Sequence, residues 1–303
     1  MGFIRWGGKK FYPQKPKPYK PDINELMKPL SEKVGKGNIW GSQIMNVEKD
    51  GGTPTPPPST DPDYQAVLDY ATLQGYTLPS ASGQTLQNDL VVELKSAGIW
   101  SDLDIFYVMA TDGDEDFAKL NWKQPSSFNL VENGSVNFIT NVGFQNDIAV
   151  NTNYLDTQFD PSLYGSGYTL NDAARILWDY DATPGGQNIF DGGTTTRWRG
   201  DFNTTQRINQ GNTNLPTAFD NTGLGFKMMQ RTSSSNVNMY NNSSTGTSFS
   251  VNSTSVQSDS QILFRRGGSG TSVRKLSVYG MGASLSGMEN DLLNAITTYM
   301  GGL

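Results

Sequence analysis

The stretch Val136–Phe144, VNFITNVGF, alternates apolar with polar or small side chains, and so does Ala174–Tyr180, ARILWDY. Successive side chains of a β-strand point to opposite faces, so this period of two residues predicts strands that bury one face. Clusters of Gly, Asn, Ser or Pro separate such runs, and many short strands between turn signals predict an antiparallel β-sandwich or barrel. The same alternation returns in shorter pairs, which are Val237 with Met239, Phe249 with Val251, Ile262 with Phe264, and Leu276 with Val278.

Helical periodicity appears on both sides of these strands. Asp63–Leu73 and Thr85–Ala97 carry apolar residues at helical spacing, and Gly98 is placed to end the second helix. A dense apolar run over Leu103–Ala110 predicts a strand between them and the alternating stretches. Near the end of the sequence, Ser286 and the glutamate three residues later have the spacing of a capping box before a third helix, which Gly301 and Gly302 would end. The helical residues expected to face inward are Tyr64, Val67, Leu68, Ala71, Leu86, Leu90, Val91, Leu94, Met288, Leu292, Ile296 and Tyr299.

The residue types present limit the chemistry. The chain has 303 residues with no Cys and no His, and only 17% of them are charged. It therefore has no disulfide framework, no Ser-His-Asp triad, no Cys-His pair and no histidine metal ligand. No run approaches the roughly 18 apolar residues needed to span a bilayer, and the first residues contain no apolar signal segment. We expect a protein that is not an enzyme and that has no resident cofactor and no membrane span.

Charge is unevenly distributed along the chain. Residues 1–49 hold ten Lys or Arg and four Asp or Glu, a balance of +6, whereas the remainder holds 13 basic and 25 acidic residues, a balance of −12. Residues 1–20 contain six basic residues and no acidic one, and four prolines by position 21 favour an extended chain. A segment that has apolar side chains but no core of its own commonly orders on a partner. The anchoring residues expected in this arm are Phe3, Ile4, Arg5, Trp6, Lys9, Lys10, Phe11 and Tyr12.

The partner of the arm is expected to be a protein. Lys and Arg neutralise phosphates and aromatic rings stack on bases, so a nucleic acid is an alternative. The prolines keep the arm extended and its aromatic residues are few for a stacking platform, which favours docking to an acidic protein surface. Residues 51–62, GGTPTPPPSTDP, have the composition of a semi-rigid linker. The predicted organisation is a basic arm over residues 1–50, this linker, and one domain over residues 63–303.

Four motifs in the predicted domain carry a resemblance to a known family. They are residues 94–104 (LKSAGIWSDLD), 153–162 (NYLDTQFDPS), 168–173 (YTLNDA) and 278–286 (VYGMGASLS). In this order they resemble the concanavalin A-like, LamG-like jelly-roll domains of bacteriophage tail, fibre and appendage proteins. The resemblance covers about residues 63–303 and leaves the arm outside it.

The resemblance implies a mainly β fold, an antiparallel concanavalin A-like jelly-roll β-sandwich with short flanking helices, carried behind the extended N-terminal arm. It also implies a place in the virion, as an appendage that is often a homo-oligomer and often taken to bind host-surface glycans. The resemblance carries no catalytic residue over to this chain, and it does not say whether the arm joins a head or a tail protein.

Three functions remain open at this point. In the first, the chain is a virion structural protein whose arm binds other virion proteins of the capsid or tail and whose sandwich is displayed for host attachment or decoration. In the second, it is a glycan-binding module or a glycosidase acting on a host-surface polysaccharide. In the third, it is an architectural capsid-vertex or neck subunit.

Asp112, Asp114 and Asp116 alternate in DGDED, as the first ligands of a calcium loop do. The sixth and twelfth positions of such a loop require Gly and Glu, and this chain has Phe117 and Lys123 there. The three aspartates are therefore a weak Ca²⁺ candidate, and a solvated acidic turn is the favoured interpretation.

A second candidate site surrounds Trp198 in TRWRGD, residues 196–201. An exposed Trp ring stacks on sugars while Arg197, Arg199 and Asp201 bond their hydroxyls, which predicts a glycan site; the alternative is that Trp198 packs in the core. A sandwich glycosidase of the kind considered would carry Glu-x-Asp-x-x-Glu on one strand, which holds its two carboxylates close together. The closest string is Asp179-Tyr-Asp181, which lacks the last Glu.

Overall fold

The computed structural model describes residues 59–146, 152–180, 189–193, 196–266, 269–271 and 273–303. The chain divides into two units, residues 1–57 and 58–303, of which the second contains all the described residues. The predicted arm and most of the predicted linker lie outside the described residues, so the extended conformation of the arm stays a prediction. The last two residues assigned to the linker, Asp61 and Pro62, are the N-cap and the first residue of a helix.

The larger sheet has eight antiparallel strands in the order β13-β12-β11-β6-β17-β4-β3, and β1 pairs with β17 beside this path. Its central strand β6 pairs along most of its length with β11 on one side and β17 on the other. These strands are β1 (Leu103–Val108), β3 (Asn137–Ile139), β4 (Gly143–Gln145), β6 (Ala173–Asp179), β11 (Gly225–Ser233), β12 (Asn236–Asn241), β13 (Thr247–Ser250) and β17 (Lys275–Gly282).

The smaller sheet has five strands in the order β2-β5-β14-β7-β8. Its strands are β2 (Val131–Asn133), β5 (Tyr154–Asp156), β14 (Ile262–Leu263), β7 (Ile189–Gly192) and β8 (Arg197–Arg199). Two short ribbons complete the β structure, namely β9 (Phe202–Asn203) with β10 (Phe219–Asp220) and β15 (Arg265–Arg266) with β16 (Ser269–Thr271).

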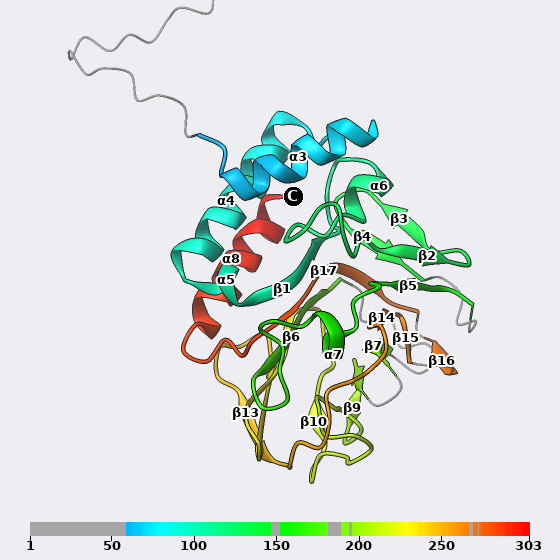
Figure 1. Ribbon diagram of the computed structural model, residues 1–303, viewed down its shortest axis with the longest axis vertical. Coiled ribbons are helices and arrows are strands. Elements are labelled where there is room, and N and C mark those ends of the chain that lie inside the picture. The colour runs from blue at the N-terminus through cyan, green and yellow to red at the C-terminus, as the bar shows by residue number, and fades with distance from the viewer. Residues whose placement is uncertain (1–58, 147–151, 181–188, 194–195, 267–268, 272) are drawn as a thin grey trace, which may run out of the picture. The chain divides into compact units, whose positions relative to one another are not determined.

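Helices form a third layer on the larger sheet (Figure 1). The three long ones are α3 (Pro62–Gln74), α4 (Ala81–Ser96) and α8 (Glu289–Gly302), and the single-turn helices α5 (Ile99–Asp102) and α6 (Glu115–Ala118) lie beside them. A further single-turn helix, α7 (Pro161–Tyr164), lies apart from this layer. None of the helices in the described ranges is both long and apolar enough to cross a membrane.

Two cores lie on the two faces of the larger sheet. On β6, Ala174 and Ile176 pack against the helices, whereas Leu177 packs between the two sheets. On β11, Met228 packs against the helices and Met229 packs between the two sheets. Each fully buried apolar side chain of this size contributes about 1.5–3 kcal/mol, so both faces of the sheet are needed for stability. The expected class, a mainly β antiparallel sandwich with flanking helices, is confirmed, and the helices form a whole layer on one sheet.

The helix expectations are mostly confirmed. α3 buries Tyr64, Val67, Leu68 and Ala71, the four residues expected to face inward. α4 begins four residues before the expected start, because the side chain of Ser80 accepts a hydrogen bond from the backbone N–H of Gly83 and caps it.

The predicted capping box of the last helix is wrong. Met288 is the N-cap residue of α8 and makes no side-chain cap hydrogen bond, so Ser286 does not cap the helix. Glu289 accepts hydrogen bonds from the backbone N–H of Gly287 and from the side chains of Gln230 and Tyr240. The start of α8 is therefore held by the larger sheet, and a pattern within one segment cannot show such contacts.

The opening stretch of alternating residues is a hairpin of two strands, β3 and β4. Asn141 in the turn and Gly143, the first residue of β4, have φ values of 61° and 112°, which turn the chain back on itself. An alternating pattern continues through such a turn without a visible break, so the sequence alone does not show it.

Charged side chains cross the space between the sheets. Arg175 of β6 and Asp191 of β7 are fully buried, and Arg175 Nη1 lies 2.7 Å from Asp191 Oδ1. The hydroxyl of Tyr279, on β17, donates to Asp191 Oδ2 at 2.7 Å. Arg231, also fully buried, donates to the carbonyl oxygens of Ile208 and Val251. These bonds fix the smaller sheet and the long loops around it in one register against the larger sheet.

Candidate functional site

The site around Trp198 differs from the one expected. The Trp198 ring is fully buried and packs edge-on against Phe190 with ring centroids 5.9 Å apart, so it has no face open to a sugar. Arg197 and Arg199, its neighbours on β8, are half-buried, as strand alternation requires. Arg199 donates two hydrogen bonds to Asp201. Trp198 therefore packs in the core, which was the alternative expectation. Glycan binding by Arg197, Arg199 and Asp201 stays a prediction, and it can no longer include stacking on the Trp198 ring.

The three aspartates of the calcium candidate bind different parts of the chain. Asp112 accepts from the backbone N–H of Ser80, and Asp114 accepts from those of Thr77 and Phe117. Asp116 lies 3.8 Å from the ammonium group of Lys119. Within the described ranges no group of three or more His, Cys, Asp or Glu is placed to hold a metal ion.

Two hollows, of about 520 and 420 Å³, lie along the seam between α4 and α8, and we call the two together the α4–α8 groove. The lining residues of α4 are spaced three or four positions apart, so they lie on one face of the helix, and the same holds for α8. The two hollows therefore lie on one line. The α4 residues are Ser82, Gly83, Thr85, Leu86, Asp89, Val92, Glu93, Ser96 and Ala97, and the α8 residues are Asp291, Asn294, Ala295, Thr298 and Gly302.

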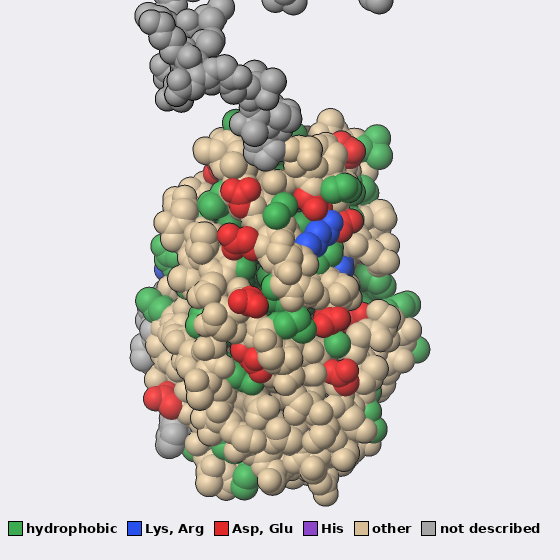
Figure 2. All heavy atoms as spheres, turned by 90° about the vertical axis from the view of Figure 1, so that its left-hand side faces the viewer, with side chains coloured by type: hydrophobic (Ala, Val, Ile, Leu, Met, Phe, Trp, Pro, Cys, Tyr) green, Lys and Arg blue, Asp and Glu red, His purple; other side chains and the backbone are tan. Residues whose placement is uncertain are grey.

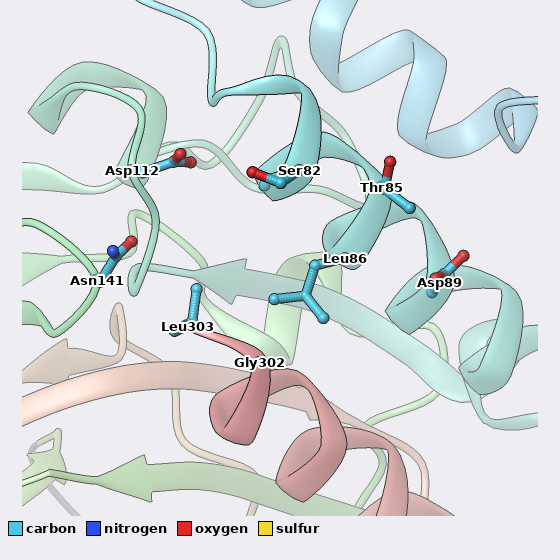
Figure 3. Close-up of a pocket in the computed structure, with 9 residues that line it drawn as sticks. Ser82, Thr85, Leu86, Asp89, Asp112, Asn141, Gly302 and Leu303 are labelled. Carbon is cyan, nitrogen blue, oxygen red and sulfur yellow. The ribbon is translucent and has the colours of Figure 1, made fainter. Parts of the chain in front are cut away.

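The wider end of this groove is shown in Figure 3. Ser82, Thr85 and Asp89 line it from α4, Asp112 and Asn141 line it from two loops, and the Ser82 side chain points toward Asp112. The carboxylate of Asp112 lies so close to Gly83 that a Cβ atom there would collide with it. Asp112 therefore fixes the start of α4 beside the groove.

A second, smaller cleft has a different character. It has a volume of about 290 Å³ and opens between the loop after α6 and the residues that follow α7. Tyr164 is 54% exposed at its rim, and its ring lies 4.9 Å from Phe128, which in turn contacts buried Phe159 edge-on at 5.4 Å. We call this the Tyr164 cleft; its lining residues are Ser101, Leu103, Asp104, Lys123, Gln124, Phe128, Phe159, Tyr164 and Ser166.

Hydrogen bonds hold the backbone and side chains that form the wall of the Tyr164 cleft. Phe128 has a φ of 58°, a conformation costly for a bulky side chain, and its carbonyl oxygen accepts from buried Tyr107 at 2.5 Å. Both carboxylate oxygens of Asp104 are occupied by donors of Ser166, Gly167 and Tyr168. The wall of the cleft is thus preorganised, and its negative charge is spread over four hydrogen bonds.

Lys123 is the basic residue in the lining of the Tyr164 cleft. Its ammonium group donates to the carbonyl oxygen of Trp100 at 2.5 Å and lies 4.4 Å from the centre of the Trp100 ring. Burial lowers the pKa of Lys123 below its ordinary value, although nearby aspartates oppose this. The side chains of Gln124 and Ser101 are exposed beside it, so the cleft presents polar groups next to the exposed ring of Tyr164.

The sequence did not single out the Tyr164 cleft. Tyr164 ends the single-turn helix α7, directly after one of the motifs that carry the family resemblance, and no periodicity marks its exposure. The positive φ of Phe128 has no sequence signal, because Gly or Asn is the usual residue there. The anchoring residues Phe3, Ile4, Arg5, Trp6, Lys9, Lys10, Phe11 and Tyr12 lie outside the described residues.

No protein-family model and no curated protein matches the chain. Three solved structures are similar to it. Domain 4 of AbnA, an extracellular GH43 arabinanase from Geobacillus stearothermophilus in complex with arabinotriose, has a TM-score of 0.38 and 12% identity over 63% of this chain and 98% of its own. A mutant of Trypanosoma rangeli sialidase displaying trans-sialidase activity has a TM-score of 0.43 and 9% identity, over 72% of this chain and 39% of its own. An HCR/D mutant has a TM-score of 0.37 and 10% identity, over 65% of this chain and 51% of its own.

The chain thus spans less than two thirds of the sialidase and HCR/D chains. All three TM-scores are below 0.5 and the identities are 9–12%, so these similarities bear on neither the chemistry nor the ligand of this chain.

Proposed function

We propose that the chain is a non-catalytic attachment module whose β-sandwich domain binds a neutral glycan in the Tyr164 cleft. The observation that carries the proposal is the exposed Tyr164 ring at the rim of a preformed polar cleft. A half-exposed aromatic ring presents a flat apolar face to the C–H groups of a sugar, while its hydroxyl stays in water. The polar groups beside it, from Ser101, Lys123 and Gln124, are of the kind that fix the orientation of a bound ligand.

Charge favours a neutral sugar over an acidic one. The chain beyond residue 49 has a balance of −12. In the cleft itself, Lys123 faces the carboxylate of Asp104, and Asp63 and Asp102 are close enough to oppose the loss of its charge. An anionic glycan would meet repulsion that a single half-buried lysine does not offset.

The basic arm and the Thr/Pro-rich linker suit display on a larger assembly. The family resemblance points to a bacteriophage virion, with the arm joined to other virion proteins and the sandwich directed outward for host attachment or decoration. A single sugar cleft binds weakly, and several copies on one particle raise avidity by roughly 10²–10⁴ without new contacts. Deletion of residues 1–50 is expected to leave a folded, glycan-binding domain that no longer joins particles.

The glycan proposal is tested on an oligosaccharide array that includes neutral and acidic host-surface structures. The whole chain, presented in multivalent form, is expected to bind a subset of the neutral structures. Tyr164→Ala should abolish this binding, and Tyr164→Phe, which keeps the ring, should retain it. Tyr180→Ala removes another exposed tyrosine, from the end of β6, and should have no effect.

Three results would contradict the proposal. An array on which nothing binds would leave only an architectural role. Equal losses from Tyr164→Ala and Tyr180→Ala would place the site elsewhere. Release of shortened oligosaccharides during incubation would show that the module is an enzyme. We expect no release, because Asp179 in the string closest to the glycosidase motif is fully buried against Arg274.

A further inference from the structure

The α4–α8 groove has the shape to hold an extended peptide segment. From Ser82 to Ala97 it follows α4 for about 22 Å, at 1.5 Å per residue. Eight of its seventeen lining residues are Gly, Ala, Ser or Thr, among them Thr85, Ala295 and Thr298, so the two helices leave space along their seam. Leu86 and Val92, which is 42% exposed, give it an apolar floor.

The groove is acidic throughout. Asp89 and Glu93 lie on α4 and Asp291 lies on α8; all three are exposed, and none has a basic group within ion-pair distance in the described ranges. α8 has no Lys or Arg, and the lysine of α4, Lys95, is bound to Asp61 and Asp63. In Figure 2, which shows the face carrying α4 and α8, acidic side chains are spread widely and basic ones are few.

The chain carries a segment of complementary charge. Residues 1–20 contain six basic residues, no acidic one, and apolar side chains such as Phe3, Trp6 and Phe11 that match an apolar floor. Residues 21–58 separate this segment from the described domain and span up to about 125 Å when extended. A spacer of this length is long enough to reach a neighbouring molecule.

We propose that the α4–α8 groove binds residues 1–20 of a second copy of this chain, so that copies assemble by exchanging arms. This inference goes beyond the attachment function, because it names the partner of the arm. It does not depend on glycan binding: a blank glycan array would leave it intact, and its own failure would leave the Tyr164 cleft intact.

The first test measures binding of a labelled synthetic peptide of residues 1–20 to the isolated domain, residues 59–303, by fluorescence anisotropy. This domain contains both hydrophobic cores and every described contact, so it is expected to fold alone. We expect saturable binding that weakens as salt rises, because the attraction is between exposed charges. A peptide of the same composition in scrambled order should bind more weakly, since its aromatic residues no longer match the floor.

Matched charge variants decide whether the groove is the site. The double variant Glu93→Gln with Asp291→Asn should weaken peptide binding about 3- to 10-fold, the effect expected of two exposed charge contacts. The control variant Asp69→Asn with Asp116→Asn removes the same charge from exposed positions on α3 and α6 and should leave binding within twofold, roughly the scatter of a surface charge effect. Equal weakening by both variants, or no binding at all, would overturn the proposal.

The second test asks which copy supplies the arm. Light scattering of the whole chain at low salt should show a mass that rises with concentration and returns to the monomer at high salt. The groove variant Glu93→Gln with Asp291→Asn should need a higher protein concentration than the natural chain to reach the same mass at low salt. If the peptide binds in the groove but the whole chain stays monomeric at every concentration, the arm occupies its own domain and exchange between copies is wrong.

Discussion

At the scale of single residues, Asp191 is the most consequential charge in the sandwich. It is fully buried, and burial raises its pKa, while Arg175 and the hydroxyl of Tyr279 stabilise its charged form. Arg175 and Asp191 come from different sheets, so the pair joins the two layers. A buried pair of this kind contributes little net stability, yet the loss of one partner leaves a charge without compensation.

A double-mutant cycle tests this account of the pair. Arg175→Leu leaves Asp191 buried alone and should lower the free energy of unfolding by about 3–5 kcal/mol. The double variant Arg175→Leu with Asp191→Leu should lose less than Arg175→Leu alone, which urea denaturation would show. As a control, Arg199→Leu breaks the partly exposed pair with Asp201 and should cost about 1 kcal/mol or less. Fully additive losses in the cycle would contradict the account.

Single residues also show what the sequence could and could not predict. Trp198 alternates with two arginines on β8, and that alternation alone is compatible with a buried ring, which the structure has. Tyr164 and Phe128 are different, because their cleft depends on a one-turn helix and on a strained backbone joined by tertiary contacts. The candidate glycan site therefore had no sequence signal, whereas the core was largely visible.

At the scale of elements, β17 shows how close approach shapes the fold. Its register shifts between Leu276 and Val278, so the first faces the sandwich core and the second faces the helices. The alternation of these two residues suggested a common face, which is wrong because of this bulge. Gly282 at its end meets the backbone of Asp102 and Leu103 where β17 pairs with β1.

Gly282→Ala tests this close approach. A Cβ atom at Gly282 would lie 2.7 Å from Leu103 Cα and would collide with the carbonyl oxygen of Asp102. Because both are backbone atoms, β1 must shift, and we expect a loss of about 1–3 kcal/mol, typical of overpacking. Gly301→Ala, in α8 with nothing within 4 Å, should be neutral or stabilising. Equal thermal unfolding midpoints for the two variants would contradict this interpretation.

The start of α3 predicts a pH dependence. Burial alone would raise the pKa of Asp61, but hydrogen bonds from Lys95 and from backbone N–H groups lower it below its ordinary value. A carboxylate whose pKa is lowered in the folded state stabilises the fold at pH values above its pKa in the unfolded chain, about 3.9. This stability is lost as pH falls through the pKa of the folded state. Asp61 also caps α3 through the backbone N–H of Asp63.

Two variants separate the cap from the charge. Asp61→Ala removes both and should cost about 1–2 kcal/mol at pH 7. Asp61→Asn keeps a capping oxygen, so it should cost less than Asp61→Ala at pH 7. As pH falls through the lowered pKa of folded Asp61, the difference between Asp61→Asn and the natural chain should shrink, and it should vanish once both side chains are uncharged. Thermal unfolding between pH 2.5 and 7, roughly the range over which carboxyl groups titrate, measures both effects. A stability difference between Asp61→Asn and the natural chain that does not change with pH would contradict this account.

At the scale of the whole molecule, the described domain consists of one helical layer and two sheets with different surfaces available for binding. The helical layer carries the acidic α4–α8 groove, and the Tyr164 cleft opens beside α7. Composition and periodicity were enough to predict helices and an antiparallel sandwich or barrel, because these depend on local patterns, and the family resemblance selected the sandwich. Neither binding surface was visible at that level, since each is built from segments far apart in the sequence.

The most direct test of the attachment function follows the Tyr164 ring itself during glycan addition. Nuclear magnetic resonance of the chain with isotope-labelled tyrosine rings separates the signals of Tyr164 and Tyr180, each assigned by substitution. The account predicts that a neutral oligosaccharide shifts the Tyr164 ring signals in a saturable manner and leaves those of Tyr180 unchanged. Saturable glycan binding with unshifted Tyr164 signals would contradict it.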